Sequence, residues 1–297
     1  MKTFKEDYFL KRYKNNIQFI RKEDNFINKI FESNNCGKFK VIGINKLLKD
    51  RICYPYYICE FIETGYQCLA LASAIKRGSI KDNYIKSVFG IGYLGEYDGN
   101  KGKDPLYKTW VQMLSRCYNE KNPDYRKDCF VSKEWHCFYT FKNDCENLLG
   151  YKDMIDNPSI KYSLDKDFIS QNNNIYSKEK CCFMPQDLNS FILNTRKDRD
   201  YKFEGVYYRK DCRTYRASIR YKGKTKHIIY SHDPRIAHEA YWNKKRNIAH
   251  EILNEKYSFV CEDIKTIIYD RLELKYHQSR HELEKAIDNG YFKRLEE

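Results

Sequence analysis

The strongest constraint on the fold is an alternation of side chains over residues 205–230, which read GVYYRKDCRTYRASIRYKGKTKHIIY. Three runs in this stretch are rich in β-branched and aromatic residues, and Lys222-Gly223-Lys224 is typical of a hairpin turn. Successive residues of a strand point to opposite faces of a sheet. The pattern therefore predicts strands over 205–210, 214–221 and 224–230, with one apolar face and one basic face.

The two faces of this predicted sheet differ in chemistry. Alternation places Tyr215, Ala217 and Ile219 inward, together with Val206 and Tyr208. The outward residues are Tyr207, Arg209, Arg216, Ser218, Arg220, Thr225 and His227. A helix is predicted to begin at Asp233 and Pro234, with an apolar stripe of Ile236, Ala237, Ala240, Tyr241, Ile248 and Ile252. A sheet covered on one side only offers its basic side to the major groove of DNA, where Arg pairs bidentately with guanine; a merely solvated face is the alternative.

Residues 203–245 resemble the DNA-binding domain of plant ethylene-response factors, which also occurs attached to phage homing endonucleases. The shared features are Gly205-Val206, the run YRASIR, the Gly223-Lys224 turn, and Ala237, Ala240 and Tyr241 of the helix. The resemblance implies DNA contacts by Tyr207, Arg209, Ser218, Arg220, Thr225 and His227. The basic face and the turn add Arg216, Lys222 and Lys224 as DNA-binding candidates.

A second candidate site lies in residues 162–189, which read YSLDKDFISQNNNIYSKEKCCFMPQDLN. Alternation predicts Asp165 and Asp167 on the same side of a strand, with Lys166 opposite. Carboxylates of this kind hold Mg²⁺, whose remaining ligands are water and phosphate oxygens. The Asn-rich run predicts a turn, residues 175–185 a second strand, and residues 186–192 a helix carrying Asn189. The sequence thus predicts a ββα metal finger.

Residues 104–194 resemble the phage-encoded HNH endonuclease family through YKTWVQMLSRCYN, V..EW..F..F, LDKD and N.IYS.E.C.F.P..LN. The resemblance implies a metal-dependent DNA endonuclease in which Asp165, Asp167 and Asn189 bind Mg²⁺ or another divalent cation. Lys166 occupies the position of the family's histidine, the general base. Lys166 would then contact a phosphate, and His136 becomes a candidate base, its alternative being a helix-surface histidine. A non-catalytic, sequence-specific DNA-binding protein that retains a degenerate finger is the second hypothesis.

The composition favours a nucleic-acid partner. Lys and Arg exceed Asp and Glu by 14 charges, and cations that neutralise phosphates gain affinity by releasing counterions. Duplex DNA is favoured over RNA as the partner. The alternative explanation of the positive charge is the lysine-rich composition that an AT-rich genome produces. The 12 cysteines include no closely spaced pairs typical of zinc sites, so zinc is not expected, although Cys117, Cys129, Cys137 and Cys145 offer a set with irregular spacing. Without a long apolar run, we expect a cytoplasmic protein with no membrane partner; the oligomeric state is open.

Changes of hydrophobic period divide the chain into segments and predict a multi-domain α+β fold. The residues after Asp104 and Pro105 also predict a helix, with Leu106, Trp110, Met113, Leu114 and Cys117 on one face. The expected organisation is a helical lead (1–35), a small β-rich domain (36–103), an HNH-like ββα nuclease domain with flanking helices (104–196), a three-stranded antiparallel sheet with a helix (201–256) and a C-terminal helical segment (257–297).

Overall fold

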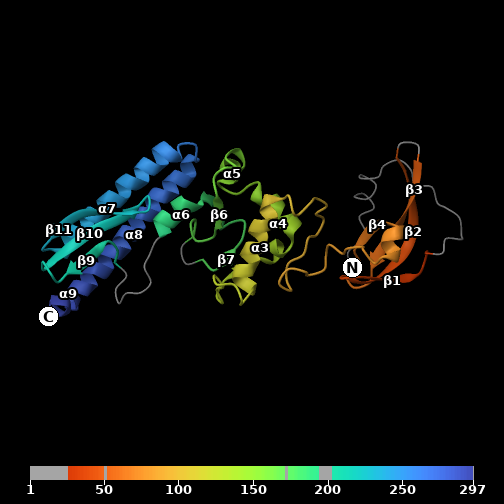
Figure 1. Ribbon diagram of the computed structural model, residues 1–297, viewed down its shortest axis with the longest axis horizontal. Coiled ribbons are helices and arrows are strands. Elements are labelled where there is room, and N and C mark those ends of the chain that lie inside the picture. The colour runs from red at the N-terminus through yellow and green to blue at the C-terminus, as the bar shows by residue number, and fades with distance from the viewer. Residues whose placement is uncertain (1–25, 50–51, 171–172, 194–202, 297) are drawn as a thin grey trace. The chain divides into compact units, whose positions relative to one another are not determined.

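The computed structural model describes residues 26–49, 52–170, 173–193 and 203–296, and the fold is mixed α/β (Figure 1). Two compact units are present. The N-terminal unit comprises Met1–Lys127 and Val131–Lys142, and the C-terminal unit comprises Asp128–Phe130 and Asn143–Glu297. The range 104–196, which the sequence suggests as one domain, crosses this division. The ranges 201–256 and 257–297 fall together in the C-terminal unit.

The N-terminal unit contains an antiparallel sheet in the order β1 (Ile30–Ser33), β2 (Gly37–Lys49), β3 (Ile52–Phe61) and β4 (Gln67–Leu71), followed by α2 (Ala72–Lys76). Its core consists of Phe39, Val41, Tyr57, Cys59, Phe61, Ala70, Ile75 and Ile80. The prediction of a helical lead is wrong for residues 30–33, because Phe31 pairs with Phe39 across the ladder and their rings lie 5.9 Å apart. Residues 1–25 of that lead lie outside the described residues.

The helix predicted after Asp104 is confirmed as α3 (Pro105–Tyr118). The Asp104 carboxylate accepts a hydrogen bond from the Leu106 backbone N–H, which caps the helix, and all five residues of the predicted apolar face are buried. The strand β5 (Phe130–Val131), the 3₁₀ helix η1 (Lys133–His136) and α4 (Phe138–Cys145) follow. Trp110 Nε1 donates to the Trp135 carbonyl at 2.7 Å, which joins α3 to η1 within the N-terminal unit.

In the C-terminal unit, the predicted order of strand, turn, strand and helix is present. After α5 (Tyr151–Asp156), β6 (Tyr162–Asp165) pairs antiparallel with β8 (Cys182–Pro185), and α6 (Gln186–Leu193) follows β8 directly. The second strand is shorter than predicted. A separate strand β7 (Ile175–Tyr176) comes first, and a turn then separates β7 from β8, in which the Lys180 and Cys181 N–H groups donate to the Ser177 carbonyl.

The predicted three-stranded sheet is confirmed as β9 (Val206–Arg209), β10 (Thr214–Tyr221) and β11 (Lys224–Ser231), in the order β11-β10-β9. The helix α7 (Pro234–Glu251) packs on the face that carries Val206, Tyr215 and Ala217. One member of the predicted helical stripe is wrong, since Ile236 is 54% exposed. The sequence also missed Trp242, which is completely buried.

Trp242 is buried because α7 also packs against the long helix α8 (Glu262–Asp288). The helix α8 begins after the π-helical turn η2 (Ile252–Lys256) and precedes α9 (Tyr291–Glu296). Figure 1 shows α7 and α8 side by side, and ion pairs such as Arg235–Glu284 join them. Because α7 contacts the sheet on one side and α8 on another, it buries two stripes rather than one.

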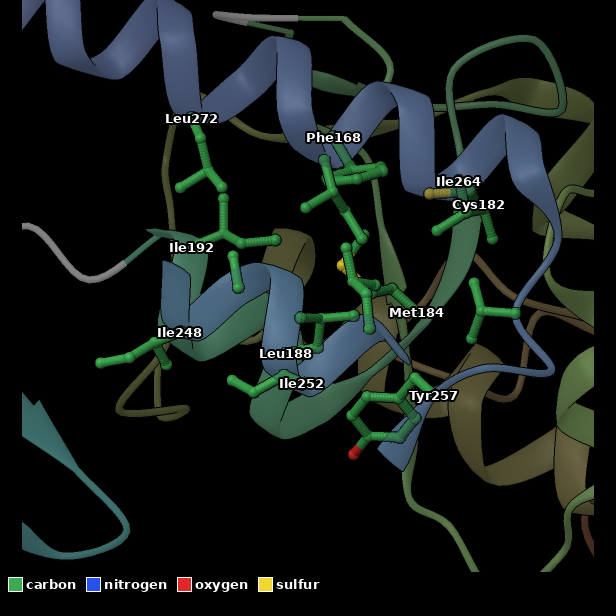
Figure 2. Close-up of a cluster of buried hydrophobic side chains, with 14 of the residues drawn as sticks. Phe168, Cys182, Met184, Leu188, Ile192, Ile248, Ile252, Tyr257, Ile264 and Leu272 are labelled. Atoms are coloured by element: carbon green, nitrogen blue, oxygen red, sulfur yellow. The ribbon is translucent and has the colours of Figure 1, made fainter. Parts of the chain in front are cut away.

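A single hydrophobic core connects the ββα unit, the end of α7 and α8. It contains Phe168, Cys182, Met184, Leu188, Ile192, Ile219, Trp242, Ile248, Ala249, Ile252, Leu253, Tyr257, Val260, Ile264, Ile268 and Leu272. Figure 2 shows many of these side chains converging between the helices. Further along α8, Leu283 and Ala286 pack beneath the three-stranded sheet. The ββα unit and the sheet are therefore built on one shared helix. No helix among residues 26–49, 52–170, 173–193 and 203–296 has the length and apolar character needed to cross a bilayer.

A buried histidine on α7 makes the stability of this unit depend on pH. His238 Nε2 accepts a hydrogen bond from Trp242 Nε1 at 3.0 Å and lies 2.9 Å from Ser279 Oγ. Burial lowers the pKa of His238 from 6.5 to about 4. His238 is therefore protonated below about pH 6.5 in the unfolded chain but only below about pH 4 in the folded chain. This contribution to stability is complete above pH 6.5 and is lost as the pH falls.

We expect the free energy of unfolding to fall by about 2 kcal/mol between pH 7 and pH 5 through His238. The measurement is denaturant unfolding of wild type and His238→Gln across this range. His238→Gln should be less stable at pH 7 and should have a flatter pH profile. His250→Gln changes an exposed histidine of the same helix and should retain the wild-type slope. An unchanged slope in His238→Gln would refute the assignment.

Candidate nucleic-acid interface and acidic site

The outer face of the three-stranded sheet is defined by the strand register. Arg216 lies opposite Tyr207 on β9, Ser218 opposite His227 on β11, and Arg220 opposite Thr225. Directly opposed residues share a face, so the predicted outward set of Tyr207, Arg209, Arg216, Ser218, Arg220, Thr225 and His227 does occupy one face. Each of these residues is exposed or half-buried, whereas Val206, Tyr215, Ala217 and Ile219 of the opposite face are buried.

A β-bulge adds one residue to this face that the sequence did not reveal. The register between β10 and β11 shifts between Ala217 and Ser218, so that Ala217 pairs with Ile229 and Ser218 with His227. The extra residue, Ile228, reverses the alternation of β11 beyond it. Tyr230 therefore lies opposite Arg216 on the outer face and is 43% exposed. Its ring centroid lies 4.2 Å from that of His227.

The hairpin turn extends the basic surface at one end of the sheet. Lys222 and Gly223 have φ values of +50° and +75°, the left-handed pair that a two-residue hairpin loop requires. Lys222 is exposed and its Nζ lies 3.6 Å from the Glu251 carboxylate, while Lys224 is exposed at the start of β11. Both predicted DNA-binding lysines thus stand at the tip of the sheet.

At the end of the sheet away from this turn, Arg209, the last residue of β9, is held by two neighbours. Arg209 Nε donates to Asp211 Oδ1 at 2.9 Å, and Arg209 Nη2 donates to Asp211 Oδ2. Arg209 Nη1 donates to the Tyr230 hydroxyl at 2.8 Å. The hydrogen bonds from Arg209 lower the pKa of the Asp211 carboxyl, and those to Asp211 and Tyr230 raise the pKa of Arg209. The guanidinium is thereby fixed in one orientation on an exposed surface.

The acidic site is organised around Asp165, the last residue of β6. Its Oδ1 accepts the backbone N–H groups of Asp167 at 2.9 Å and Phe168 at 2.7 Å, and its Oδ2 accepts Asn189 Nδ2 at 2.7 Å. The prediction that Asp165 and Asp167 share a strand face is wrong. The strand ends at Asp165, whose carboxylate caps the turn that follows, and Asp167 lies within that turn.

Lys166 and Asp167 pair with each other rather than facing a common metal position. Lys166 Nζ lies 2.8 Å from Asp167 Oδ1 and also donates to the Asn173 carbonyl. The Lys166 side chain is only 11% exposed, whereas that of Asp167 is 47% exposed. Asn173 closes the loop by donating to the Lys166 and Ile175 carbonyls at 2.9 and 2.7 Å. Lys166 therefore has a structural role in this loop, and a phosphate would have to compete with these partners.

Asn189 reaches Asp165 from the first half of α6. Its Nδ2 donates to Asp165, but its Oδ1 is buried and has no hydrogen-bond partner among the described residues. A buried amide oxygen without a partner is costly, and such groups often mark a bound ion or water. A carboxylate oxygen and an amide oxygen in adjacent side chains are the ligand types that Mg²⁺ accepts. Asp165 and Asn189 thus carry ligand types of a divalent cation, but a cation there would have to displace the Asn189 amide N–H from Asp165 Oδ2. Asp167 is paired with Lys166 instead.

Arg271 on α8 supports this turn, and no sequence pattern indicates it. Its Nε donates to the Phe168 carbonyl at 2.8 Å, and its Nη2 donates to the Asp167 carbonyl. Burial lowers the pKa of Arg271, and the charges of Asp165 and Asp167 oppose that shift. The contact spans more than 100 residues of chain, so no local pattern could have revealed it.

His136, the candidate base, belongs to the N-terminal unit, whereas Asp165, Lys166, Asp167 and Asn189 belong to the C-terminal unit. Its Nε2 lies 3.4 Å from the Tyr118 hydroxyl, and their rings meet edge to face. Burial lowers the pKa of His136, so the imidazole is neutral at pH 7. The structure places no histidine within the ββα unit over residues 162–193 that it describes, in agreement with the sequence.

The cysteines proposed as an alternative zinc set are Cys117, Cys129, Cys137 and Cys145, and each is buried. Within the described residues, no group of three or more His, Cys, Asp or Glu side chains is gathered in the manner of a metal site. A cation at Asp165 and Asn189 would therefore depend on one carboxylate, one amide, water and the phosphate of a substrate.

Comparison with known proteins gives no relative for this chain: no protein-family model, no curated protein and no solved structure matches it.

Proposed function

We propose that this chain binds duplex DNA through the outer face of β9, β10 and β11. The observation that carries the proposal is the division of this sheet into two faces. Its inner face is closed by α7, while its outer face carries arginines, polar residues and aromatic rings and ends in the Lys222–Lys224 turn. Arginine side chains on a sheet can read the edges of bases in the major groove, and the net charge of +14 favours a polyanion.

The DNA-binding surface is tested by removing two arginines from it. Arg209→Ala combined with Arg220→Ala should weaken binding to the preferred duplex by about 100-fold, since a bidentate contact to a base contributes about 1–3 kcal/mol. The measurement is a fluorescence anisotropy titration at fixed salt concentration. The matched control is Lys265→Ala combined with Lys285→Ala on α8, which removes the same charge and should change affinity by less than about threefold. Equal losses in both variants would refute the proposal.

Duplex DNA is the preferred partner because the deep major groove of A-form RNA is too narrow to admit a sheet. A competition titration with structured RNA separates the two partners. RNA that displaces the duplex at equal concentration would favour an RNA-binding function instead.

The second candidate function is cleavage of the bound strand by an HNH-like centre in the ββα unit. The observation in its favour is the buried, partnerless Oδ1 of Asn189, whose Nδ2 donates to the Asp165 carboxylate. Asp165 and Asn189 would hold the cation, and the backbone N–H groups of residues 167 and 168 and Arg271 keep Asp165 and its turn in place. A divalent cation bound there would polarise a phosphate oxygen and acidify a water molecule. Without such activity, the chain would be a DNA-binding regulator.

A plasmid-nicking assay with Mg²⁺ tests this activity. We expect Asp165→Ala and Asn189→Ala to lower the nicking rate at least 100-fold while DNA affinity stays within about threefold of wild type. Glu179→Ala, which removes an exposed carboxylate from the turn between β7 and β8, should nick normally. Loss of product with a chelator must accompany these results. Absence of a metal-dependent product from the wild type would leave the DNA-binding function alone.

A further inference from the structure

One arginine of the outer face differs from the others in how it is held. The Arg209 side chain is 37% exposed, yet its guanidinium has one partner from the turn after β9 and one from the outer face. Asp211, two residues along the chain, binds Nε and Nη2, and Tyr230, from the far strand of the sheet, binds Nη1. The guanidinium carbon also lies 5.5 Å from the centre of the Tyr230 ring.

A count of the N–H groups of Arg209 shows which donors remain for a ligand. A guanidinium has five N–H groups. Asp211 uses one on Nε and one on Nη2, and Tyr230 uses one on Nη1. One N–H remains on each terminal nitrogen. Guanine presents two acceptors, O6 and N7, in the major groove, which is the complement of two such donors.

Tyr230 is itself positioned for this contact by the fold. The bulge at Ile228 turns it to the outer face, and its ring lies against that of His227. An exposed carboxylate on a surface that binds phosphates repels the ligand, so Asp211 lowers general affinity for DNA. Asp211 weakens general binding but holds Arg209 in one orientation. Such preorganisation lowers the entropy lost on binding, so Asp211 favours a specific contact between Arg209 and a base.

We propose that Arg209 reads a guanine in the major groove and that Asp211 and Tyr230 are its positioning residues. This inference rests on the DNA-binding function proposed above and names one base of its target. Arg209 provides the pair of donors, Asp211 orients the plane of the guanidinium, and Tyr230 sets its distance from β11.

The experiment is selection of bound sequences from a randomised duplex pool, followed by titration of single-base variants of the selected site. Wild type should prefer guanine over adenine by about 10-fold or more at one position. Asp211→Asn should reduce that preference to below about threefold at this position alone, while its affinity for random duplex stays equal or rises. Tyr230→Phe keeps the ring beside His227, lacks the hydroxyl, and should give an intermediate preference.

The matched control is Glu251→Gln. This variant also removes one negative charge beside a cation, Lys222, but should leave the base preference at every position unchanged. Arg209→Ala should remove the same preference as Asp211→Asn, and the double variant should lose no more. A full wild-type profile in Asp211→Asn, or a preferred base other than guanine at the position that Arg209→Ala affects, overturns the inference. A wild type that binds duplex DNA without preference also overturns it, whereas a wild type that fails to bind duplex DNA refutes the underlying function.

Discussion

Gly205→Ala is expected to lower the free energy of unfolding of the C-terminal unit by about 3–4 kcal/mol, as the sum of backbone strain and overpacking. Gly205 has a φ of +83°, and a Cβ atom added to it would lie 2.0 Å from Cγ of Tyr241. The close approach brings the start of β9 against α7. The Tyr241 ring packs in the hydrophobic core on both sides of α7, so it cannot withdraw freely.

Chemical denaturation of Gly205→Ala and Gly223→Ala measures the two contributions separately. Gly223 has a similar φ of +75°, but an added Cβ there meets nothing within 4 Å. Gly223→Ala should therefore cost only the backbone strain, about 1–2 kcal/mol. Combining Gly205→Ala with Tyr241→Ala should cost less than the sum of the single changes, because the second change removes the atoms that clash. Equal losses at the two glycines would contradict the steric explanation.

The second large effect is expected at the buried ion pair between Lys245 and Glu204. Lys245 Nζ lies 2.8 Å from the Glu204 carboxylate, and the two side chains are 2% and 11% exposed. Burial also lowers the pKa of neighbouring Lys275 to about 8, a shift that the charge of Glu204 opposes. Glu204→Ala leaves these cations without their counter-charge and should cost about 3–5 kcal/mol.

Restoring neutrality should recover most of this loss. Glu204→Leu combined with Lys245→Met replaces the pair with apolar side chains and should lie within about 2 kcal/mol of wild type in denaturant unfolding. Lys285→Met provides the control, because its partner Glu282 lies 3.1 Å away on the surface of α8 and such pairs contribute less than about 1 kcal/mol. A double variant as unstable as Glu204→Ala would show that the charge balance is not the cause.

The parts of the fold that local patterns determine were predictable from the sequence. The strands β9, β10 and β11 follow from alternation and a two-residue turn, and α3 follows from a cap at Asp104 and an apolar face. The turn after β6 was not predictable in detail, because alternation continues through Asp167 in the sequence while the Asp165 carboxylate binds the backbone and ends the strand. A short polar side chain here overrides the strand pattern.

The remaining features depend on contacts between distant parts of the chain. Arg271 meets the turn at Phe168, and α8 gives α7 its second buried stripe, neither of which leaves a local signal. The bulge at Ile228 lacks the glycine that often marks such an irregularity. Strict alternation along β11 therefore does not predict Tyr230 on the outer face. In each case the sequence identifies the residue but not the distant residue that it contacts.

The shared helix α8 has a consequence for the order in which the molecule assembles. During synthesis the ββα unit and the three-stranded sheet leave the ribosome before Ile264, Leu272 and Leu283 do. Both therefore keep apolar surface uncovered until α8 is made. The three-stranded sheet and the turn after Asp165 are therefore expected to complete their packing only after α8 is present.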